Sequence, residues 1–281
     1  MKSALAGVSP FAFNALRLTV SALTLGIADR LEARGRVRSP IPWGAVAGLA
    51  LLTSLVYQVL FISGIEHTSA GHSGFLIASG PLWTALLARG AGVDHPSRRA
   101  WTGLVLAFLG TSVVALATGG NRSATLFGNA LMLLATITWA SGTVWSRHVL
   151  EHFSATRLAF LTNLLALPGH WFLASGSLAR DWSGGQGALD GATWAAIVYS
   201  GVFSTGLAYV LWNWSVRRLG PSRTSAFVNI VPVCSLVVAW IFLGERPGSM
   251  QLAGGGLIVL GLALWGLEPS KAAPPTDLVA E

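Results

Sequence analysis

The chain has 281 residues, of which 53% are hydrophobic and only 10% are charged, and its mean hydropathy is +0.62. A soluble domain carries about 25% charged residues, so this composition excludes an ordinary soluble globular protein. The net charge of +7 comes from basic loops, and we do not interpret it as a nucleic-acid-binding surface.

The hydrophobic residues fall into long runs that short charged or turn-rich segments separate. A helix needs about 20 apolar residues to cross the bilayer core. Nine runs approach this length: 10–28, 43–65, 70–90, 100–118, 125–146, 156–178, 192–214, 222–243 and 249–267. We therefore expect an all-α polytopic membrane protein with short loops.

Residues 43–116 align with residues 194–267 without a gap, at a constant offset of 151. The landmarks of this alignment pair Pro81 with Pro232, Pro96 with Pro247, Gly103 with Gly254 and Gly110 with Gly261. Many small-molecule carriers are built from two such repeats. We predict a first membrane repeat at 1–120, a second at 124–268 and a cytoplasmic tail at 269–281.

Further back in the chain, Ser9 aligns with Ser154 at an offset of 145, which places the counterpart of the run 125–146 before Met1. The expected fold is thus a ten-helix inverted repeat of two five-helix halves, with most of the first helix missing from this chain. An upstream start explains this best; a functional nine-span protein or a defective fragment are the alternatives. Because five spans are an odd number, the halves enter the membrane from opposite sides and pack antiparallel.

Basic residues are concentrated in alternate connections. The first of these contains Arg30, Arg34, Arg36 and Arg38, and every second connection after it is basic, up to Lys271. Short loops rich in arginine and lysine stay in the cytoplasm, so we expect a cytoplasmic C-terminus. The use of 16 arginines against 2 lysines favours a GC-rich bacterial source, and hence the bacterial inner membrane.

Polar and aromatic residues in the middle of spans are the candidate substrate-binding residues, because placing them in lipid costs free energy. Tyr209, Trp212 and Asn213 share one helix face. The full set of predicted substrate-binding residues is Gln58, Ser79, Trp83, Trp139, Tyr209, Trp212, Asn213 and Asn229. Such aromatic and amide side chains suit amino acids, their derivatives or flat neutral metabolites.

Two prolines, Pro81 and Pro232, are predicted hinges, because a proline leaves a backbone carbonyl without its helical hydrogen bond. Other aromatic residues fit a different role. Tryptophans near the ends of spans usually anchor them at the membrane interface, and we assign this role to Trp43, Trp101, Trp194 and Trp265.

Arg17 lies inside the first span, roughly 10 Å past Pro10 at 1.5 Å per residue. As a functional residue it would hold a substrate carboxylate. As a structural residue it would bind freed carbonyls or reach the interface. The sequence favours the structural interpretation and leaves the other open.

Three groups of residues carry a family resemblance. They are Ser9-Pro10 followed by Arg17, the triplet Thr138-Trp139-Ala140, and two blocks that run from proline to glycine, Pro81–Asp94–Gly103–Gly110 and Pro232–Leu243-Gly244-Glu245-Arg246–Gln251–Gly254–Gly261. With these residues the chain resembles the EamA-type permeases of the drug/metabolite transporter superfamily. The resemblance implies ten helices, alternating access to a central site, and export of small metabolites.

Energy coupling has no obvious residue in the sequence, because all 11 acidic residues lie in loops or near span ends. A facilitator, a potential-driven carrier, or proton transfer through Glu66 or His67 are the alternatives. No ATP-binding loop is present, and we expect no cofactor, no metal and no enzymatic activity.

The sequence analysis therefore predicts an inner-membrane secondary transporter, with a small-molecule substrate and membrane lipid as partners and no nucleic acid. A homodimer is an assembly that the sequence leaves open. The competing functions are a facilitator or importer of a neutral metabolite, a non-transporting membrane scaffold and an intramembrane enzyme.

Overall fold

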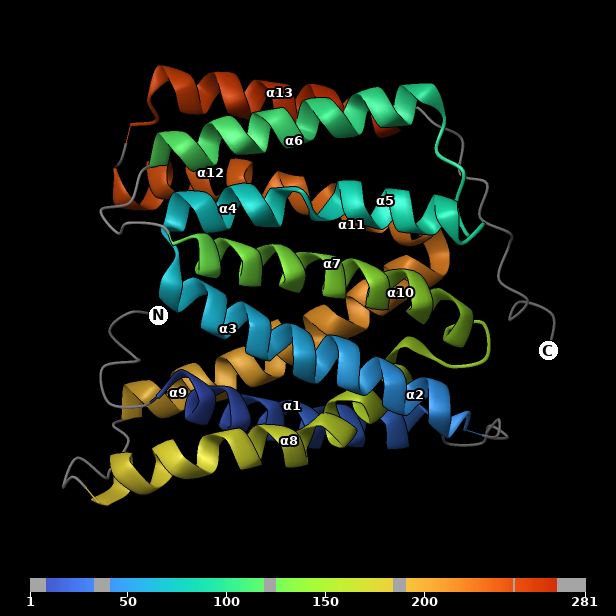
Figure 1. Cartoon of the computed structure of the whole chain (residues 1–281), viewed down its shortest axis with the longest axis vertical. Helices are drawn as coiled ribbons and strands as arrows, with labels where there is room; N and C mark the ends of the chain where they lie inside the picture. Colours follow the sequence, from blue (N-terminus) through green and yellow to red (C-terminus); the bar gives the residue numbers. More distant parts are fainter. Residues whose placement is uncertain (1–8, 33–40, 119–124, 184–190, 245, 267–281) are drawn as a thin grey trace. The chain divides into compact units, whose positions relative to one another are not determined.

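The computed structural model of the chain describes residues 9–32, 41–118, 125–183, 191–244 and 246–266. These residues form helices joined by short connections, with no strand among them, which confirms the expected all-α fold (Figure 1). The α-helices are α1 Pro10–Glu32, α2 Trp43–Leu49, α3 Tyr57–His67, α4 Ala70–Ala78, α5 Gly80–Gly90, α6 Arg98–Thr118, α7 Leu126–Val149, α8 Ala155–Ser183, α9 Gly191–Tyr199, α10 Ala208–Leu219, α11 Pro221–Ala226, α12 Val231–Leu243 and α13 Ser249–Gly266.

Eight helical stretches among the described residues are long and apolar enough to cross a membrane. They correspond to eight of the nine predicted runs. The remaining run, 70–90, is also helical but is divided into α4 and α5 at Ser79. Pro81 stands in the first turn of α5, where its missing N–H leaves no hydrogen bond unmade.

The irregular segments of the two repeats occupy equivalent positions. The π-helices η1 (Ala50–Val56) and η2 (Ser200–Leu207) overlap when the offset of 151 is applied. The same offset carries the break at Ser79 onto the 3₁₀ segment η3 (Phe227–Ile230), which precedes α12. At the offset of 145, Ser9 and Ser154 each accept a hydrogen bond from the backbone N–H three residues later.

The described residues belong to two compact units, and each unit combines segments of both repeats. Unit 1 is Met1–Gln58 with His148–Trp214, and unit 2 is Val59–Arg147 with Ser215–Glu281.

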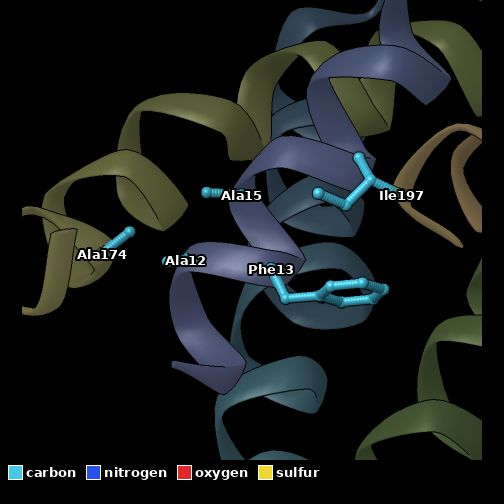
Figure 2. Close-up of a cluster of buried hydrophobic side chains, with 5 residues drawn as sticks. All are labelled: Ala12, Phe13, Ala15, Ala174 and Ile197. Atoms are coloured by element: carbon cyan, nitrogen blue, oxygen red, sulfur yellow. The ribbon is translucent and has the colours of Figure 1, made fainter. Parts of the chain in front are cut away.

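In unit 1, helices α1 and α8 pack side by side and run antiparallel. Ser21 of α1 accepts a hydrogen bond from Asn163, whereas Asn14, earlier in α1, contacts His170, later in α8. A core cluster of Ala12, Phe13, Ala15, Ala174 and Ile197 lies at this packing (Figure 2). Figure 2 shows Ala12 and Ala15 on the side of α1 that faces Ala174, with Phe13 and Ile197 on the other side.

In unit 2, helices α6 and α13 lie side by side (Figure 1). A Cβ atom added to Gly103 would lie 2.5 Å from the carbonyl oxygen of Gly261, and one added to Gly110 would lie 2.5 Å from that of Gly254. Gly103 and Gly254 are equivalent in the two repeats, as are Gly110 and Gly261, so each contact is the symmetric counterpart of the other. This is the pattern of a two-fold interface, and it confirms antiparallel packing of the two repeats at this helix pair.

One tryptophan departs from the predicted interface role. Trp265 is only 4% exposed and belongs to a core cluster with Ala85, Ala100, Leu104 and Ala226, against which Trp101 also packs. The assignment of Trp265 to the interface was therefore wrong, because the close contact of α6 and α13 encloses its side chain. Trp43 and Trp194 are exposed.

Candidate functional site

The most polar feature of unit 1 is a chain of hydrogen bonds that begins at Arg17. The Nε of Arg17 donates to Oδ1 of Asn14 at 2.7 Å, and its Nη2 donates to Oε1 of Gln58 at 3.2 Å. Asn14 Nδ2 lies 3.2 Å from Nδ1 of His170, and His170 Nε2 lies 2.6 Å from the carbonyl oxygen of Ser54. Asn14 and His170 are 2% and 1% exposed, so this chain lies in the interior of the unit.

The direction of every hydrogen bond in this series follows from its two end groups, the guanidinium of Arg17 and the carbonyl of Ser54. A guanidinium only donates, so Asn14 must face Arg17 with its carbonyl oxygen and His170 with its NH2 group. A backbone carbonyl only accepts, so His170 donates from Nε2 to Ser54 and accepts at Nδ1. The network therefore assigns the neutral imidazole with its proton on Nε2, and it fixes the orientation of Asn14.

The π-helix η1 contains Ser54, whose carbonyl oxygen is the last acceptor in this series of hydrogen bonds. Hydrogen bonds in a π-helix follow an i to i+5 pattern, and such segments are frequent at functional sites. Thr53 and Ser54 of η1 are both buried, and Thr53 Oγ1 lies 3.0 Å from the hydroxyl of Tyr209. The equivalent π-helix η2 packs on α1, where a Cβ on Gly201 would lie 2.7 Å from the carbonyl oxygen of Arg17.

Four predicted binding residues belong to unit 1: Gln58, Tyr209, Trp212 and Asn213. Gln58 and Tyr209 contact the polar residues just described, and both are half-buried, as is Trp212. Asn213 is 1% exposed, and its Nδ2 donates to the carbonyl oxygen of Ala155 at 3.5 Å. Asn213 thus holds the first turn of α8 in this structure, although its spacing places it on the face of Tyr209.

Unit 2 contains a cavity with a volume of about 460 Å³. Its lining comes from both repeats: α4 and α6 on one side, and η3, α12 and α13 on the other. Most of the lining is aliphatic, and the polar side chains are Thr111, Asn229, Ser235 and Gln251. A volume between about 300 and 1,000 Å³ with few polar groups is usual for sites that bind small molecules.

Asn229 is the distinctive residue of this cavity. It is 2% exposed, yet its Nδ2 has no hydrogen-bond partner among the described residues. The oxygens of two other polar lining residues are engaged locally, since Thr111 donates to Ala107 and Gln251 accepts from Gly248. A buried amide without a partner costs about 1–3 kcal/mol, so the position is suited to a ligand that accepts its hydrogen bond.

The cavity is asymmetric although it lies between equivalent segments. Ile77 and Ala78 of α4 correspond to Val228 and Asn229 at the offset of 151, and all four line the cavity. The first repeat therefore contributes an apolar position where the second contributes an amide. Pro232, a predicted hinge, also lines the cavity and stands in the first turn of α12.

Three further predicted binding residues belong to unit 2: Ser79, Trp83 and Trp139. Each is half-buried, and none of them lines the described cavity. Ser79 donates to the carbonyl oxygen of Leu76 at 2.6 Å. This bond secures the end of α4, directly before the predicted hinge Pro81.

The sequence analysis did not select Asn14 or His170. Both are polar residues in the middle of a span, which was the criterion used, but their contact joins positions 156 residues apart. The mid-span position of His170, two residues after Pro168, was the signal available to find it.

Comparisons with known proteins agree with this architecture. The EamA-like transporter family matches the chain in two stretches, residues 1–116 and 126–267. One solved crystal structure has a TM-score of 0.76 at 22% sequence identity, and the match covers 94% of this chain and 91% of that one.

Several proteins of known sequence are similar over most of the chain. The "Probable terminal-alkyne amino-acid exporter" of Streptantibioticus cattleyicolor is 29% identical over 88% of this chain and 81% of its own length. The "Probable amino-acid metabolite efflux pump" of Salmonella typhimurium is 26% identical over 80% and 77%. An "Uncharacterized transporter" of Archaeoglobus fulgidus is 26% identical over 91% and 88%.

Proposed function

We propose that this chain, which belongs to the EamA-like transporter family, exports small metabolites such as amino acids or related compounds from a bacterial cell. Family membership makes it a multi-pass membrane transporter, in line with the eight apolar helices found among its described residues. In this proposal it is a secondary transporter of the inner membrane with a cytoplasmic C-terminus, as the basic loops favour.

The cavity around Asn229 is the observation that carries this proposal. It lies between segments of the two repeats, where carriers built from repeats hold their substrates. The Nδ2 of Asn229, which has no partner among the described residues, can donate hydrogen bonds to a ligand, and the aliphatic lining accepts an apolar side chain or a flat ring. A small amino acid derivative has both parts.

The helix junctions support alternating access. Each repeat breaks at an equivalent position, before Pro81 in the first and before Pro232 in the second. A break in a helix needs little rearrangement to change its angle, so the two junctions are suited to open the cavity to alternate sides. The names of the relatives from Streptantibioticus cattleyicolor and Salmonella typhimurium support amino acids or their metabolites as the class of substrate.

A growth assay tests the proposal. A bacterial host that expresses the chain is grown on toxic analogues of amino acids, such as p-fluorophenylalanine, and of nucleobases, such as 5-fluorouracil. We expect resistance to analogues of one class. Asn229→Leu should lose this resistance at an unchanged level of membrane-inserted protein, because Leu keeps the branched shape of Asn229 and removes its hydrogen bond.

Exposed Trp43 offers a control, since it does not line the cavity, and Trp43→Phe should retain resistance. Sensitisation by the wild-type chain would indicate an importer instead. Growth that is the same with and without well-inserted protein would count against export of these compounds and would favour a scaffold.

A further inference from the structure

Arg17 of unit 1 places a permanent positive charge inside a membrane span, and no acidic side chain is bonded to it among the described residues. In the described part of the chain, the side chains bonded to its guanidinium are the neutral amides of Asn14 and Gln58. A charge in a span is expensive unless it pairs, and such residues usually mark a pathway for a solute or an ion.

A structural arginine of the same protein makes different contacts. Arg147 in unit 2 donates from Nη1 to the backbone carbonyl oxygens of Val216 and Arg217, and so satisfies the last turn of α10. Arg17 contacts no backbone carbonyl in the described residues and is held by two side chains from α1 and α3. Among the described residues, Arg17 therefore does not bind the freed carbonyls that the structural interpretation named, and the functional interpretation stays open.

One end of the Arg17 guanidinium is open. Nε and Nη2 are bonded, whereas Nη1 has no hydrogen bond within the described residues. The orientation of this end is fixed, because Asn14 is itself held by the neutral His170 and the carbonyl of Ser54.

We propose that Arg17 provides, within unit 1, a binding site for the carboxylate of a transported solute. A guanidinium with an open end forms two parallel hydrogen bonds to a planar carboxylate, and the single positive charge matches a monoanion. Asn14 and His170 are positioning residues that aim the guanidinium. This inference rests on the proposed function, and it narrows the substrates to compounds that bear a carboxylate.

The titratable and charged side chains around this hydrogen-bond chain are Tyr57 and Tyr209 in addition to Arg17 and His170. In the described part of the chain, no acidic side chain contacts Arg17 that would compete with an incoming carboxylate.

The test compares acids with their uncharged amides on the purified full chain in lipid nanodiscs. The probes are L-phenylalanine, L-leucine, L-threonine and benzoate, each beside its amide, and the readout is the concentration at which thermal stabilisation is half-maximal. We expect at least one acid to stabilise the wild-type protein and its amide to do so much less. Arg17→Gln should weaken binding of that acid by about tenfold to a hundredfold, the usual range for hydrogen bonds to a charged group.

Two variants keep the test decisive if Arg17→Gln folds poorly. Gln58→Glu has nearly the same shape and places a carboxylate beside Arg17, so it should abolish binding of the acid while the unliganded protein stays at least as stable. Arg30→Gln is the matched control, because it removes an exposed charge from the last turn of the same helix, and it should bind like the wild type.

The inference is overturned if acid and amide stabilise the protein equally, if Arg17→Gln and Gln58→Glu both retain binding, or if no acid of the panel binds. Each of these outcomes is distinguishable from failure of the proposed function. Resistance to uncharged nucleobase analogues in the growth assay would leave export intact while carboxylate binding fails.

Discussion

The packing of α6 against α13 in unit 2 leads to a sharp prediction about Gly254. A Cβ atom at this position would lie 2.7 Å from the carbonyl oxygen of Gly110 and 2.8 Å from Cγ2 of Val114. The two backbones would have to separate by about 0.7 Å to reach ordinary contact, and overpacking of this kind costs about 1–3 kcal/mol. We therefore expect Gly254→Ala to destabilise the protein by about 2 kcal/mol, or roughly 4–8 °C in melting temperature for a chain of this size.

The same helix provides the control. Gly256 lies two residues further along α13, and a Cβ there would meet no atom within 4 Å. Gly256→Ala should be neutral or stabilising by up to about 1 kcal/mol, because alanine favours a helix more than glycine does. The measurement is the thermal unfolding of both variants in the same detergent, followed by intrinsic tryptophan fluorescence.

A double-mutant cycle adds a second comparison. Gly110→Ala alone should cost about as much as Gly254→Ala, because both press on one contact between α6 and α13. The double variant should then cost less than the sum, since helices already forced apart have room for the second methyl group. Close packing of α6 against α13 is refuted as the cause if the melting temperatures of Gly254→Ala and Gly256→Ala differ by less than about 1 °C.

Three further changes test other parts of the structure. His170→Leu should lower the free energy of unfolding by about 1–3 kcal/mol, because it leaves Asn14 Nδ2 and the Ser54 carbonyl without these partners. Glutamine can both donate and accept, so His170→Gln should melt at a higher temperature than His170→Leu in the same assay. Gly220→Ala should cost about 1–3 kcal/mol, since Gly220 has φ of +86° and ψ of 160° and faces Asp94. Melting like the wild type would exclude this strain. Asp94→Ala should also lower the melting temperature, because it removes the acceptor of the 2.9 Å hydrogen bond from the backbone N–H of Ser222. Asp94→Asn, which keeps an acceptor oxygen, should lower the melting temperature less. Equal decreases for the two variants would show that this hydrogen bond is unimportant.

The repeat in the sequence predicted much of the fold, because local irregularities recur wherever the sequence does. The prolines Pro81 and Pro232 mark junctions at equivalent positions, and Ser9 and Ser154 cap helices in the same manner. The glycines that serve as landmarks of the repeat lie at the close contact of α6 and α13. Gly103 faces Gly261 and not its own counterpart Gly254. This pairing follows from the antiparallel arrangement of α6 and α13, and the alignment of the repeats does not predict it.

The sites were less predictable, since they depend on which spans touch. Asn229 could be selected from its position before Pro232, and it lines the unit 2 cavity. Asn213 fitted the same criterion, but its amide bonds to the backbone of α8, a contact that spacing along one helix does not predict. The pair of Asn14 and His170 depends on the antiparallel packing of α1 against α8, which the periodicity of either span does not specify.

The central claim is that the chain moves small metabolites outward through a site that includes Asn229. The most direct test is the efflux of labelled phenylalanine, leucine and threonine from preloaded cells into medium free of these amino acids. Wild-type cells should lose at least one of the three faster than cells with an empty vector, and Asn229→Leu at equal membrane abundance should return that rate to the vector level. Efflux that is equal in all three strains, for each amino acid tested, would contradict the claim.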